Sequence, residues 1–542
     1  MAVGLAQSSK QTVLGGAIIT GAVFAAGFVL AQSQLNVLEN HPNRIIGLET
    51  ANTYHEGTVE FSVGTFQAND RGGATGNQLY FGGGSYSPSD KLTFGLDLQV
   101  YEDPTLEPIN GLYPDIRMET VALWGKYKIL DTGRLAVSAL GSVESIVNIE
   151  ADIWGGPHQP QELIGALKVP VSFLVTDRLQ FHVTPSVSFY PETIAGAQFY
   201  GTIASIGTGV SYLASNRLSF FGAIDAPISG GNTIASDGSY KKVPVWTVGG
   251  RYNVTPKIAL DGYLTNGIGV TPATSVLTFW PEGDEVLAGA RLVYTPGAKR
   301  QVSYLGVPAQ VTRREENLQQ DGLILMSADV LEPGKMRIGG WYGSNNNAGV
   351  MLGFSPDQDF EVQAIFEQPS DSPSAPSSLI PTTVVRYMIG GKLRFMDQNS
   401  GNPFSLGARV LFGRQMDNQP GKGVFFAEAA ASFKTASGLT LTANPKASGW
   451  GGTRIAGLGL GLNYAVTDGL DLIAEATPVF LDGDKMTWAA GMRYTASSGF
   501  SVDANVTNAI GRNSIFSMIG QDDVRVSLML SKTFDLSGLK RW

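Results

Sequence analysis

The stretch Tyr86-Ser-Pro-Ser-Asp-Lys-Leu92 sets a seven-residue pattern that recurs along the chain. An aromatic residue opens the pattern, and a small polar residue, a turn-forming residue, a basic residue and an aliphatic residue close it. The pattern returns at 173–179, 212–218 and 252–258, and without its basic residue at 354–360, 433–439, 464–470 and 494–500. Every copy separates two runs in which apolar and polar residues alternate. Each copy therefore predicts a tight turn between two antiparallel strands.

The aromatic residue stands at the same distance from every turn and always on the same side of it. A soluble β-protein has no physical need for this, whereas a transmembrane barrel holds its strands at the lipid headgroups with an aromatic girdle. A large soluble sandwich with repetitive turns is the alternative. The expected girdle consists of Tyr86, Tyr127, Phe173, Tyr212, Tyr252, Tyr294, Phe354, Phe433, Tyr464, Tyr494 and Phe534.

The segments between the turns have the length and alternation of membrane-crossing strands, which need about 10 residues when they are tilted. From Leu92 to Val100 every second residue is apolar, and the residues between them include Asp97 and Gln99. In the first half we expect strands near 57–67, 77–86, 92–102, 117–128, 135–147, 163–174, 179–190, 202–213, 218–227, 243–254, 258–265 and 285–294. Tight turns alternate with mostly long loops, which is the asymmetry of outer-membrane barrels. Because the first connection is long, the amino terminus is predicted on the short-turn, periplasmic side.

The composition limits the class of protein. The chain has 542 residues, 67 glycines, 16% charged residues, a net charge of -9 and no cysteine, and its mean hydropathy is +0.03. A polytopic helical membrane protein is excluded, because it would need several apolar runs of about 20 residues. The negative charge argues against nucleic acid as a partner. Without cysteine there are no disulfides, thiolate metal sites or cysteine nucleophiles.

One long apolar segment lies at the start of the chain, from Val13 to Ala31, after Lys10. A small residue precedes Gln32, as at a signal peptidase site, so residues 1–31 are predicted to be a secretory signal. The alternative is an uncleaved membrane anchor, because about 19 apolar residues are just long enough to span a bilayer. Four glycines within the segment disfavour a stable helix.

The second half of the chain repeats the first. Leu48 and Ala51 in a polar segment at 32–56 match Leu325 and Ala328, and Asp261-x-x-x-Thr265-Asn266 matches Asp503-x-x-x-Thr507-Asn508. These matches keep their order along the chain, which indicates an internal duplication. The predicted divisions are a signal at 1–31, a periplasmic lead-in at 32–56, a barrel repeat at 57–296, a linker and duplicated lead-in at 297–333, a second barrel repeat at 334–534 and a tail at 535–542.

Two repeats of about 12 strands could form two tandem barrels or one fused barrel of about 24 strands. A fused barrel would need only a short turn between the repeats. In this chain the lead-in itself is duplicated, and a long strandless stretch separates the copies. The sequence therefore favours an all-β fold of two antiparallel up-and-down barrels.

The polar face of the strands should line the lumen, because the apolar face suits lipid. The residues expected to line the pore are Glu60, Asp97, Gln99, His182, Arg251 and Arg493. An inward arginine opposite inward acids such as Glu60 and Asp97 would set a field across a narrow pore and bias which solutes pass. For each residue the alternative is a structural ion pair or a hydrogen-bond network that fills a small barrel.

Catalysis receives little support from the sequence. Of four histidines, only His182 lies on the polar face of an expected strand, and the second repeat carries Thr442 in its place. We therefore expect no enzyme activity, no metal and no cofactor. The Thr-Asn pairs at 265–266 and 507–508 are expected to shape loops.

These features resemble Gram-negative outer-membrane β-barrel proteins, and among them porin-like channels of about 12 strands. The resemblance implies an integral location in the bacterial outer membrane, contact with its lipid, insertion by the barrel-assembly machinery and passive diffusion of small solutes. A structural or surface-interaction barrel without an open pore is the second function considered, and a barrel enzyme is the third. Such chains commonly end on the aromatic of the last strand, so either Phe534 or Trp542 is the expected assembly signal.

Overall fold

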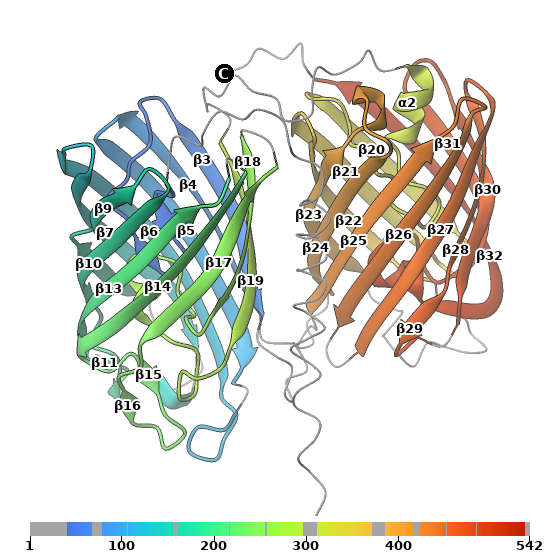
Figure 1. The fold of residues 1–542 in the computed structure, drawn as a ribbon. Helices are drawn as coiled ribbons and strands as arrows, with labels where there is room; N and C mark the ends of the chain where they lie inside the picture. Colours follow the sequence, from blue (N-terminus) through green and yellow to red (C-terminus); the bar gives the residue numbers. More distant parts are fainter. Residues whose placement is uncertain are drawn as a thin grey trace, which may run out of the picture. The chain divides into compact units, whose positions relative to one another are not determined.

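The computed structural model describes residues 41–67, 78–105, 107–150, 152–154, 161–215, 217–254, 257–295, 312–370, 385–415, 423–450, 453–483 and 485–536. The expected signal at 1–31 and the candidate assembly residue Trp542 lie outside the described residues. The chain divides into two compact units, Met1–Val302 and Ser303–Trp542. Each unit is a closed antiparallel β-barrel (Figure 1).

The strands of barrel 1 follow one another around a ring. They are β3 (Val59–Gln67), β4 (Gln78–Ser89), β5 (Leu92–Pro104), β6 (Asp115–Asp131), β7 (Leu135–Glu150), β8 (Glu162–Lys168), β9 (Val171–Thr176), β10 (Leu179–Phe189), β13 (Thr202–Leu213), β14 (Leu218–Ser229), β17 (Val245–Asn253), β18 (Ile258–Thr265) and β19 (Leu287–Tyr294). Both β8 and β9 pair with β7 and with β10, so they are two parts of one strand, and the 13 elements make 12 strands. Pro170 separates the two parts, because proline has no N–H to donate to the ladder. Pairing of β19 with β3 closes the ring.

Barrel 2 has the same arrangement. Its strands are β20 (Lys335–Gly343), β21 (Ala348–Asp357), β22 (Phe360–Gln368), β23 (Arg386–Met396), β24 (Ser405–Gln415), β25 (Gly423–Lys434), β26 (Leu439–Trp450), β27 (Thr453–Thr467), β28 (Leu470–Thr477), β29 (Val479–Leu481), β30 (Thr487–Thr495), β31 (Phe500–Ala509) and β32 (Gly520–Asp535). Short β29 continues β28 along β27, which again gives 12 strands, and β32 closes the ring on β20. The prediction of two tandem barrels is confirmed, and the single barrel of about 24 strands is wrong.

The turn at Tyr86 to Leu92 joins β4 to β5. Tyr86 pairs with Phe94 and Ser89 with Leu92, and the register shifts between the two pairs. The pattern also joins β9 to β10, β13 to β14 and β17 to β18 in barrel 1. The local turn chemistry therefore places one rim of the barrel correctly.

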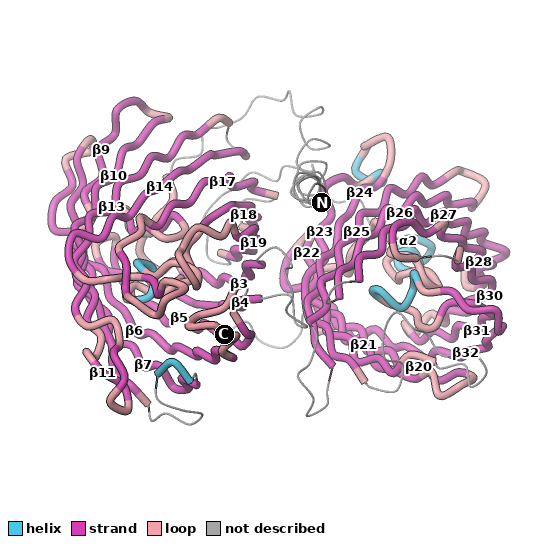
Figure 2. Tube along the Cα trace, turned by 90° about the horizontal axis from the view of Figure 1, so that it is seen from below, coloured by secondary structure: helices cyan, strands magenta, loops and turns pink. Residues whose placement is uncertain are grey.

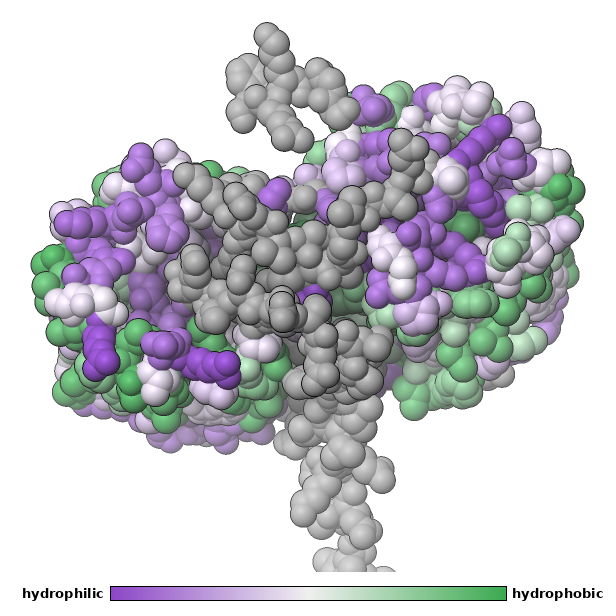
Figure 3. All heavy atoms as spheres, turned by 45° about the horizontal axis from the view of Figure 1, so that its top comes forward, coloured by the Kyte–Doolittle hydropathy of each residue, from purple (hydrophilic) through white to green (hydrophobic). Residues whose placement is uncertain are grey.

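The outer faces of both barrels are apolar. Exposed aliphatic and aromatic side chains alternate with buried polar ones along the strands, as Leu96 (41% exposed) and Leu98 (45%) do on either side of Asp97. In Figure 3 the flanks carry hydrophobic residues and the end of each barrel carries hydrophilic ones. Nine of the expected girdle residues are exposed: Tyr86, Tyr127, Phe173, Tyr212, Phe354, Phe433, Tyr464, Tyr494 and Phe534. Tyr252 and Tyr294 are half-buried.

The long loops of barrel 1 build an aromatic cluster beyond the strands. The elements that contribute are η1 (Asp152–Trp154) and the small hairpins β11 (Thr193–Ile194) with β12 (Ala197–Gln198) and β15 (Thr233–Ile234) with β16 (Tyr240–Lys241). Trp154 Nε1 donates to Tyr240 Oη at 3.1 Å, and Trp280 Nε1 donates to Tyr200 Oη at 2.5 Å. This cluster covers the long-loop end of barrel 1.

Two further segments of each unit lie inside the ring of strands (Figure 2). The first is the lead-in, residues 41–56 in barrel 1 and 312–333 in barrel 2. It contains β1 (Arg44–Ile45) and β2 (Leu48–Glu49) in barrel 1 and α2 (Arg313–Leu318) in barrel 2. The second is the inner loop. It comprises residues 266–286 with η2 (Thr274–Val276) in barrel 1 and residues 510–519 with η4 (Ser514–Met518) in barrel 2. A further short helix, η3 (Gln398–Ser400), lies between β23 and β24. Among the described residues, no helix is long and apolar enough to cross a membrane.

Candidate functional site

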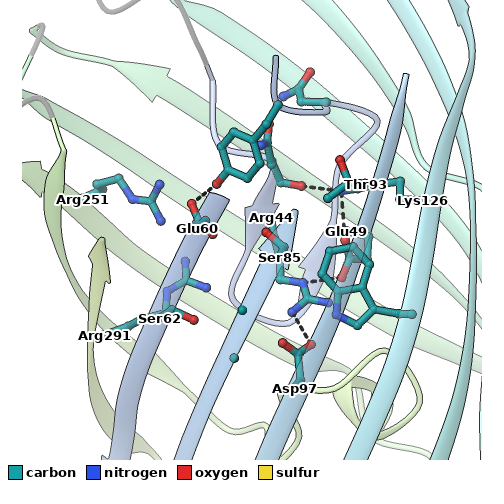
Figure 4. Close-up of a pocket in the computed structure, with 16 residues that line it drawn as sticks. Arg44, Glu49, Glu60, Ser62, Ser85, Thr93, Asp97, Lys126, Arg251 and Arg291 are labelled. Carbon is teal, nitrogen blue, oxygen red and sulfur yellow. Dashed lines mark hydrogen bonds and ion pairs between the residues drawn. The ribbon is translucent and has the colours of Figure 1, made fainter. Parts of the chain in front are cut away.

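The lead-in of barrel 1 is bound to the wall by buried ion pairs. Arg44 Nη1 donates to Asp97 of β5 at 2.7 Å and its Nε donates to Glu49 (Figure 4). Lys126 Nζ of β6 donates to Glu49 at 3.2 Å and to the carbonyl of Asn43 at 2.8 Å. The sequence predicted this segment as periplasmic, and it is instead inserted into the lumen. The physical reason is that the charged wall supplies partners for the two buried charges of the lead-in, Asp97 for Arg44 and Lys126 for Glu49.

The charge pairs determine the protonation of Glu49. Burial by itself would raise the pKa of this carboxyl, but Arg44, Lys126 and Lys168 outweigh burial and lower the pKa to about 2. Glu49 is therefore ionised at neutral pH while 3% of its surface is exposed. An ionised, buried acid of this kind holds the lead-in only as long as its cationic partners remain in place.

Wall hydroxyls satisfy the backbone of the same lead-in. Ser172 Oγ accepts the N–H of Ala51 at 2.9 Å, and Ser138 Oγ donates to the carbonyl of Ala51 at 2.8 Å. Thr184 Oγ1 donates to the carbonyl of Glu49 at 2.8 Å. Since buried backbone groups are costly to leave unpaired, these bonds fix the depth at which the lead-in lies.

A leucine of each lead-in fits against a row of glycines on the wall. Leu48 packs on Gly207 and Gly209 of β13, where a Cβ at Gly209 would come within 2.5 Å of the leucine. Leu325 packs in the same way on Gly459 and Gly461 of β27, and a Cβ at Gly459 would also come within 2.5 Å. The glycine-rich strand face thus makes room for the chain's own leucine.

The lead-in of barrel 2 is held through its backbone and through buried ion pairs. Glu475 of β28 accepts the N–H groups of Leu323 at 3.0 Å, Ile324 at 2.6 Å and Leu325 at 3.2 Å. Lys392 Nζ donates to Asp321 at 3.0 Å, and Arg409 makes a second ion pair with the same carboxylate. Barrel 2 therefore keeps side-chain ion pairs between wall and lead-in and adds a carboxylate that binds three consecutive amides.

The inner loop closes each lumen from the other side. In barrel 1, Gln99 Oε1 accepts the N–H of Val270 at 2.9 Å and Glu144 accepts the N–H of Ala273 at 2.6 Å. In barrel 2, Glu367 accepts the N–H of Arg512 at 2.7 Å. The Thr-Asn pairs anchor these loops, because Asn266 accepts from Trp246 N at 2.8 Å and Asn508 from Trp488 N at 2.7 Å, as expected for loop architecture.

Among the described residues, the cavities between lead-in and wall are small. The cavities lined by lead-in and wall residues measure about 40 Å³ in barrel 1 and about 20 and 40 Å³ in barrel 2. One water needs roughly 10–15 Å³ on this scale. The cavities of about 40 Å³ therefore have room for about three waters and the cavity of about 20 Å³ for about one, and each is too small for a sugar or an amino acid.

Closed antiparallel rings with apolar outer faces and charged interiors define the class of protein. The chain is built as two transmembrane antiparallel β-barrels in tandem.

Comparison with known proteins finds matches of structure alone. No protein-family model matches the chain, and no curated protein matches it. The NanC porin matches at 10% identity over 44% of this chain and 98% of its own, with a TM-score of 0.28. A mutant of the ferric enterobactin receptor PfeA from Pseudomonas aeruginosa matches at 9% identity over 89% of this chain and 81% of its own, with a TM-score of 0.21. The siderophore receptor PirA from Pseudomonas aeruginosa gives the same four values.

The residues expected to line the pore point inward and already have partners. Arg251 pairs with Asp261 at 2.6 Å and Arg493 with Asp503 at 2.7 Å. Asp97 binds Arg44, Gln99 binds the inner loop, and Glu60 accepts from Tyr54 of the lead-in. In this conformation Arg251 does not pair with Glu60 or Asp97 across a pore, because Asp261 on the neighbouring strand is nearer.

His182 is fully buried between two serines. Its Nδ1 lies 2.8 Å from Ser172 Oγ and its Nε2 lies 3.1 Å from Ser211 Oγ, while Ser211 also contacts His41 Nδ1 at 2.9 Å. Both ring nitrogens are thus occupied by hydroxyls, and both hydroxyls also bind the lead-in, Ser172 at Ala51 and Ser211 at His41. The side chain links the wall to the lead-in and offers no open face to a substrate.

The residues that fill the lumen had no clear sign in the sequence. Arg44 and Glu49 lie in a segment without strand periodicity, so no pattern placed them on a face. The one available clue was the duplication itself, since Leu48 and Leu325 occupy matching positions in the two lead-ins. The two halves also share a row of alternating glycines on a matching strand. A leucine and a glycine row that are both retained in the two halves would have indicated that each leucine packs on its glycine row.

Proposed function

We propose that the protein is an integral outer-membrane channel for small solutes, and that its two lumens are closed in the conformation described here. In this proposal each lumen opens when its lead-in leaves the wall, and solutes then pass by diffusion. Outer-membrane lipid surrounds the barrels, and the barrel-assembly machinery inserts them. No catalytic step is involved.

The observation that supports the proposal is the polarity of the surface beneath the lead-in. The wall of barrel 1 presents Asp97, Lys126, Ser172 and Gln180 to the lead-in, and all four are polar or charged. A permanent core would favour apolar side chains, because burying charges costs free energy even when they are paired. Water can solvate this wall if the lead-in leaves, as in an open pore.

The experiment ties the lead-in to the wall and measures conductance. The chain has no cysteine, so Asn52→Cys with Gln180→Cys gives two thiols at side chains that now contact each other at 2.9 Å. A short thiol crosslinker should abolish the conductance of barrel 1 in planar bilayers. The pair Gln320→Cys with Ser501→Cys does the same for barrel 2, where the two side chains lie 2.9 Å apart. Each single-cysteine variant, treated with the same reagent, is the matched control.

The second function considered, a structural barrel without a pore, is favoured by the small size of the remaining cavities. It predicts that the folded wild-type protein shows no conductance steps and passes no sugar into liposomes. Conductance that persists unchanged after crosslinking of both pairs would instead disprove movement of the lead-ins.

A further inference from the structure

One wall position carries opposite charges in the two barrels. Gly57 and Gly334 occupy matching turns, since each has a left-handed φ near +80° and donates its N–H to the carbonyl of a matching serine, Ser87 or Ser355. Three residues beyond these glycines stand Glu60 in β3 and Arg337 in β20. The duplication has therefore exchanged an acid for a base at one place on the lumen wall.

In barrel 1 the surroundings of this position are balanced in charge. Asp261 accepts from Arg251 at 2.6 Å and from Arg291 at 2.7 Å, so two guanidiniums share one carboxylate. Glu60 lies on the same wall and supplies the second negative charge (Figure 4). The two bases and two acids cancel.

In barrel 2 the same surroundings are positively charged. Asp503 accepts from Arg493 at 2.7 Å and from Arg512 at 3.1 Å, which repeats the sharing seen in barrel 1. Arg337 adds a third guanidinium, and it makes hydrogen bonds to Thr533 Oγ1 at 3.2 Å and to the carbonyl of Gln319 at 3.1 Å but no ion pair. Three bases therefore face one acid.

The nearby acids are engaged elsewhere. Asp321 pairs with Lys392 and Arg409. Glu361 accepts the N–H of Leu331 at 3.2 Å and the side-chain amide of Gln363 at 2.8 Å. Neither carboxylate forms an ion pair with Arg337. The charge of Glu361 offsets part of the positive charge at a distance, but no acid neutralises Arg337 by contact.

Two guanidinium nitrogens in this region are buried without a hydrogen-bond partner, Arg337 Nη2 and Arg512 Nη1. The two side chains are 3% and 8% exposed, and both line the same cavity of about 20 Å³. Its other charged lining residues are Arg409, Arg493 and Asp321, and Asp321 is already paired with Lys392 and Arg409. A buried donor on a charged group is expensive to leave unsatisfied. The cavity has room for one small particle that accepts hydrogen bonds, and water alone would not neutralise the charge.

We propose that this cavity in barrel 2 binds one small inorganic anion of the size of a halide, held by Arg337 Nη2 and Arg512 Nη1. The anion supplies the negative charge that Glu60 supplies in barrel 1. The volume of the cavity, about 20 Å³, excludes larger oxyanions such as phosphate. The site is independent of whether the lumens conduct.

The direct test uses bromide, which scatters X-rays anomalously. Crystals of the full-length protein grown with sodium bromide should show one anomalous peak in this cavity and none at the matching place in barrel 1. The Arg337→Glu variant, which restores the acid of barrel 1, should lose the peak. An ordered water at this position without an anomalous peak in the wild-type protein would overturn the proposal.

A solution measurement covers the case in which a variant gives no crystals. Replacing gluconate by bromide at constant ionic strength should raise the unfolding temperature of the wild-type protein in detergent by about 3–6 °C at ten times the dissociation constant. Arg337→Glu and Arg512→Gln should lose this rise. Lys91→Glu makes the same change in charge as Arg337→Glu on an exposed turn and should keep it. Equal bromide effects in Lys91→Glu and Arg337→Glu would also overturn the proposal.

Discussion

The two barrels keep the same shape of contact with their lead-ins and use different charges to hold them. Leu48 and Leu325 sit on matching glycine rows in β13 and β27. The polar contacts differ, because the wall of barrel 1 pairs with Arg44 and Glu49, whereas the wall of barrel 2 pairs with Asp321 and binds three backbone amides through Glu475. Steric fit to a narrow lumen has thus been preserved through the duplication, while charges that only need to balance have been rearranged.

The largest difference between the barrels should appear when the shared acid is removed. Asp503→Ala leaves Arg493 and Arg512 without their carboxylate beside the unpaired Arg337, whereas Asp261→Ala leaves two arginines near Glu60. Loss of one partner of a buried pair costs about 3–5 kcal/mol. We expect Asp503→Ala to fall at the upper end of this range and Asp261→Ala at the lower end. Denaturant unfolding of the detergent-solubilised variants measures both values, and a larger effect for Asp261→Ala would contradict the difference in charge balance.

The leucine contacts should behave alike in the two halves. Leu48→Ala and Leu325→Ala each empty a buried site (3% exposed in both cases) and should each cost about 2–4 kcal/mol of unfolding free energy. The readout is the rate at which a protease cleaves the lead-in of the folded barrel.

The glycines provide the matching test. Gly207→Ala alone should weaken the lead-in, because the new methyl group would displace Leu48, at a cost of about 1–3 kcal/mol. Combined with Leu48→Ala, the same change should cost less than the sum of the two single effects. Additive effects would show that the leucine does not rest on this glycine in solution.

Acid should loosen the lead-in of barrel 1 in a defined range of pH. The pKa of Glu49 is lowered from 4.5 in the unfolded chain to about 2 in the folded state, so its ionisation stabilises the lead-in above pH 4.5. This contribution, about 3 kcal/mol at most, is lost as the pH falls from 4.5 toward 2. Cleavage of the lead-in by an acid-active protease should rise over that range.

The variant Glu49→Gln distinguishes the pH dependence of the barrel 1 lead-in from that of the barrel 2 lead-in. The variant should remove the pH dependence of cleavage at the barrel 1 lead-in and leave that of barrel 2 unchanged. In barrel 2 the cations Arg409 and Lys392 overcome the effect of burial and hold the pKa of Asp321 well below its usual range. If the wild-type cleavage rate does not change between pH 4.5 and 2, ionised Glu49 does not hold the lead-in.

The smallest effect is expected at the turn pattern itself. Lys91 is exposed, and its counterparts at the second-half turns are Asp359, Gly438, Gly469 and Gly499. Lys91→Gly should change the unfolding free energy by less than about 0.5 kcal/mol, because exposed positions away from buried contacts rarely matter more. A greater loss, measured by the same denaturant unfolding, would show that the basic residue of the turn contributes to barrel 1 in a way that barrel 2 has replaced.

The sequence was sufficient for the parts of the fold that depend on local chemistry. Alternation with a period of two identifies a strand and its lipid face, as from Leu92 to Val100, and the turn at Ser89 to Leu92 sets the register of β4 and β5. The repeated motifs established the duplication, and the duplicated lead-in distinguished two barrels from one. Each of these inferences needed only residues that are close in the chain or repeated along it.

The content of the lumen was decided by the tertiary structure. Ala51 meets Ser172, 121 positions away, and Glu49 meets Thr184, 135 positions away, and no local pattern marks either pair. The sequence does not distinguish an inward polar residue that faces water from one that faces a buried peptide, because both environments satisfy its hydrogen bonds. Closure of the ring brings the lead-in, the inner loop and the charged wall into one small volume. The pairing of each acid with its base is determined only in that volume.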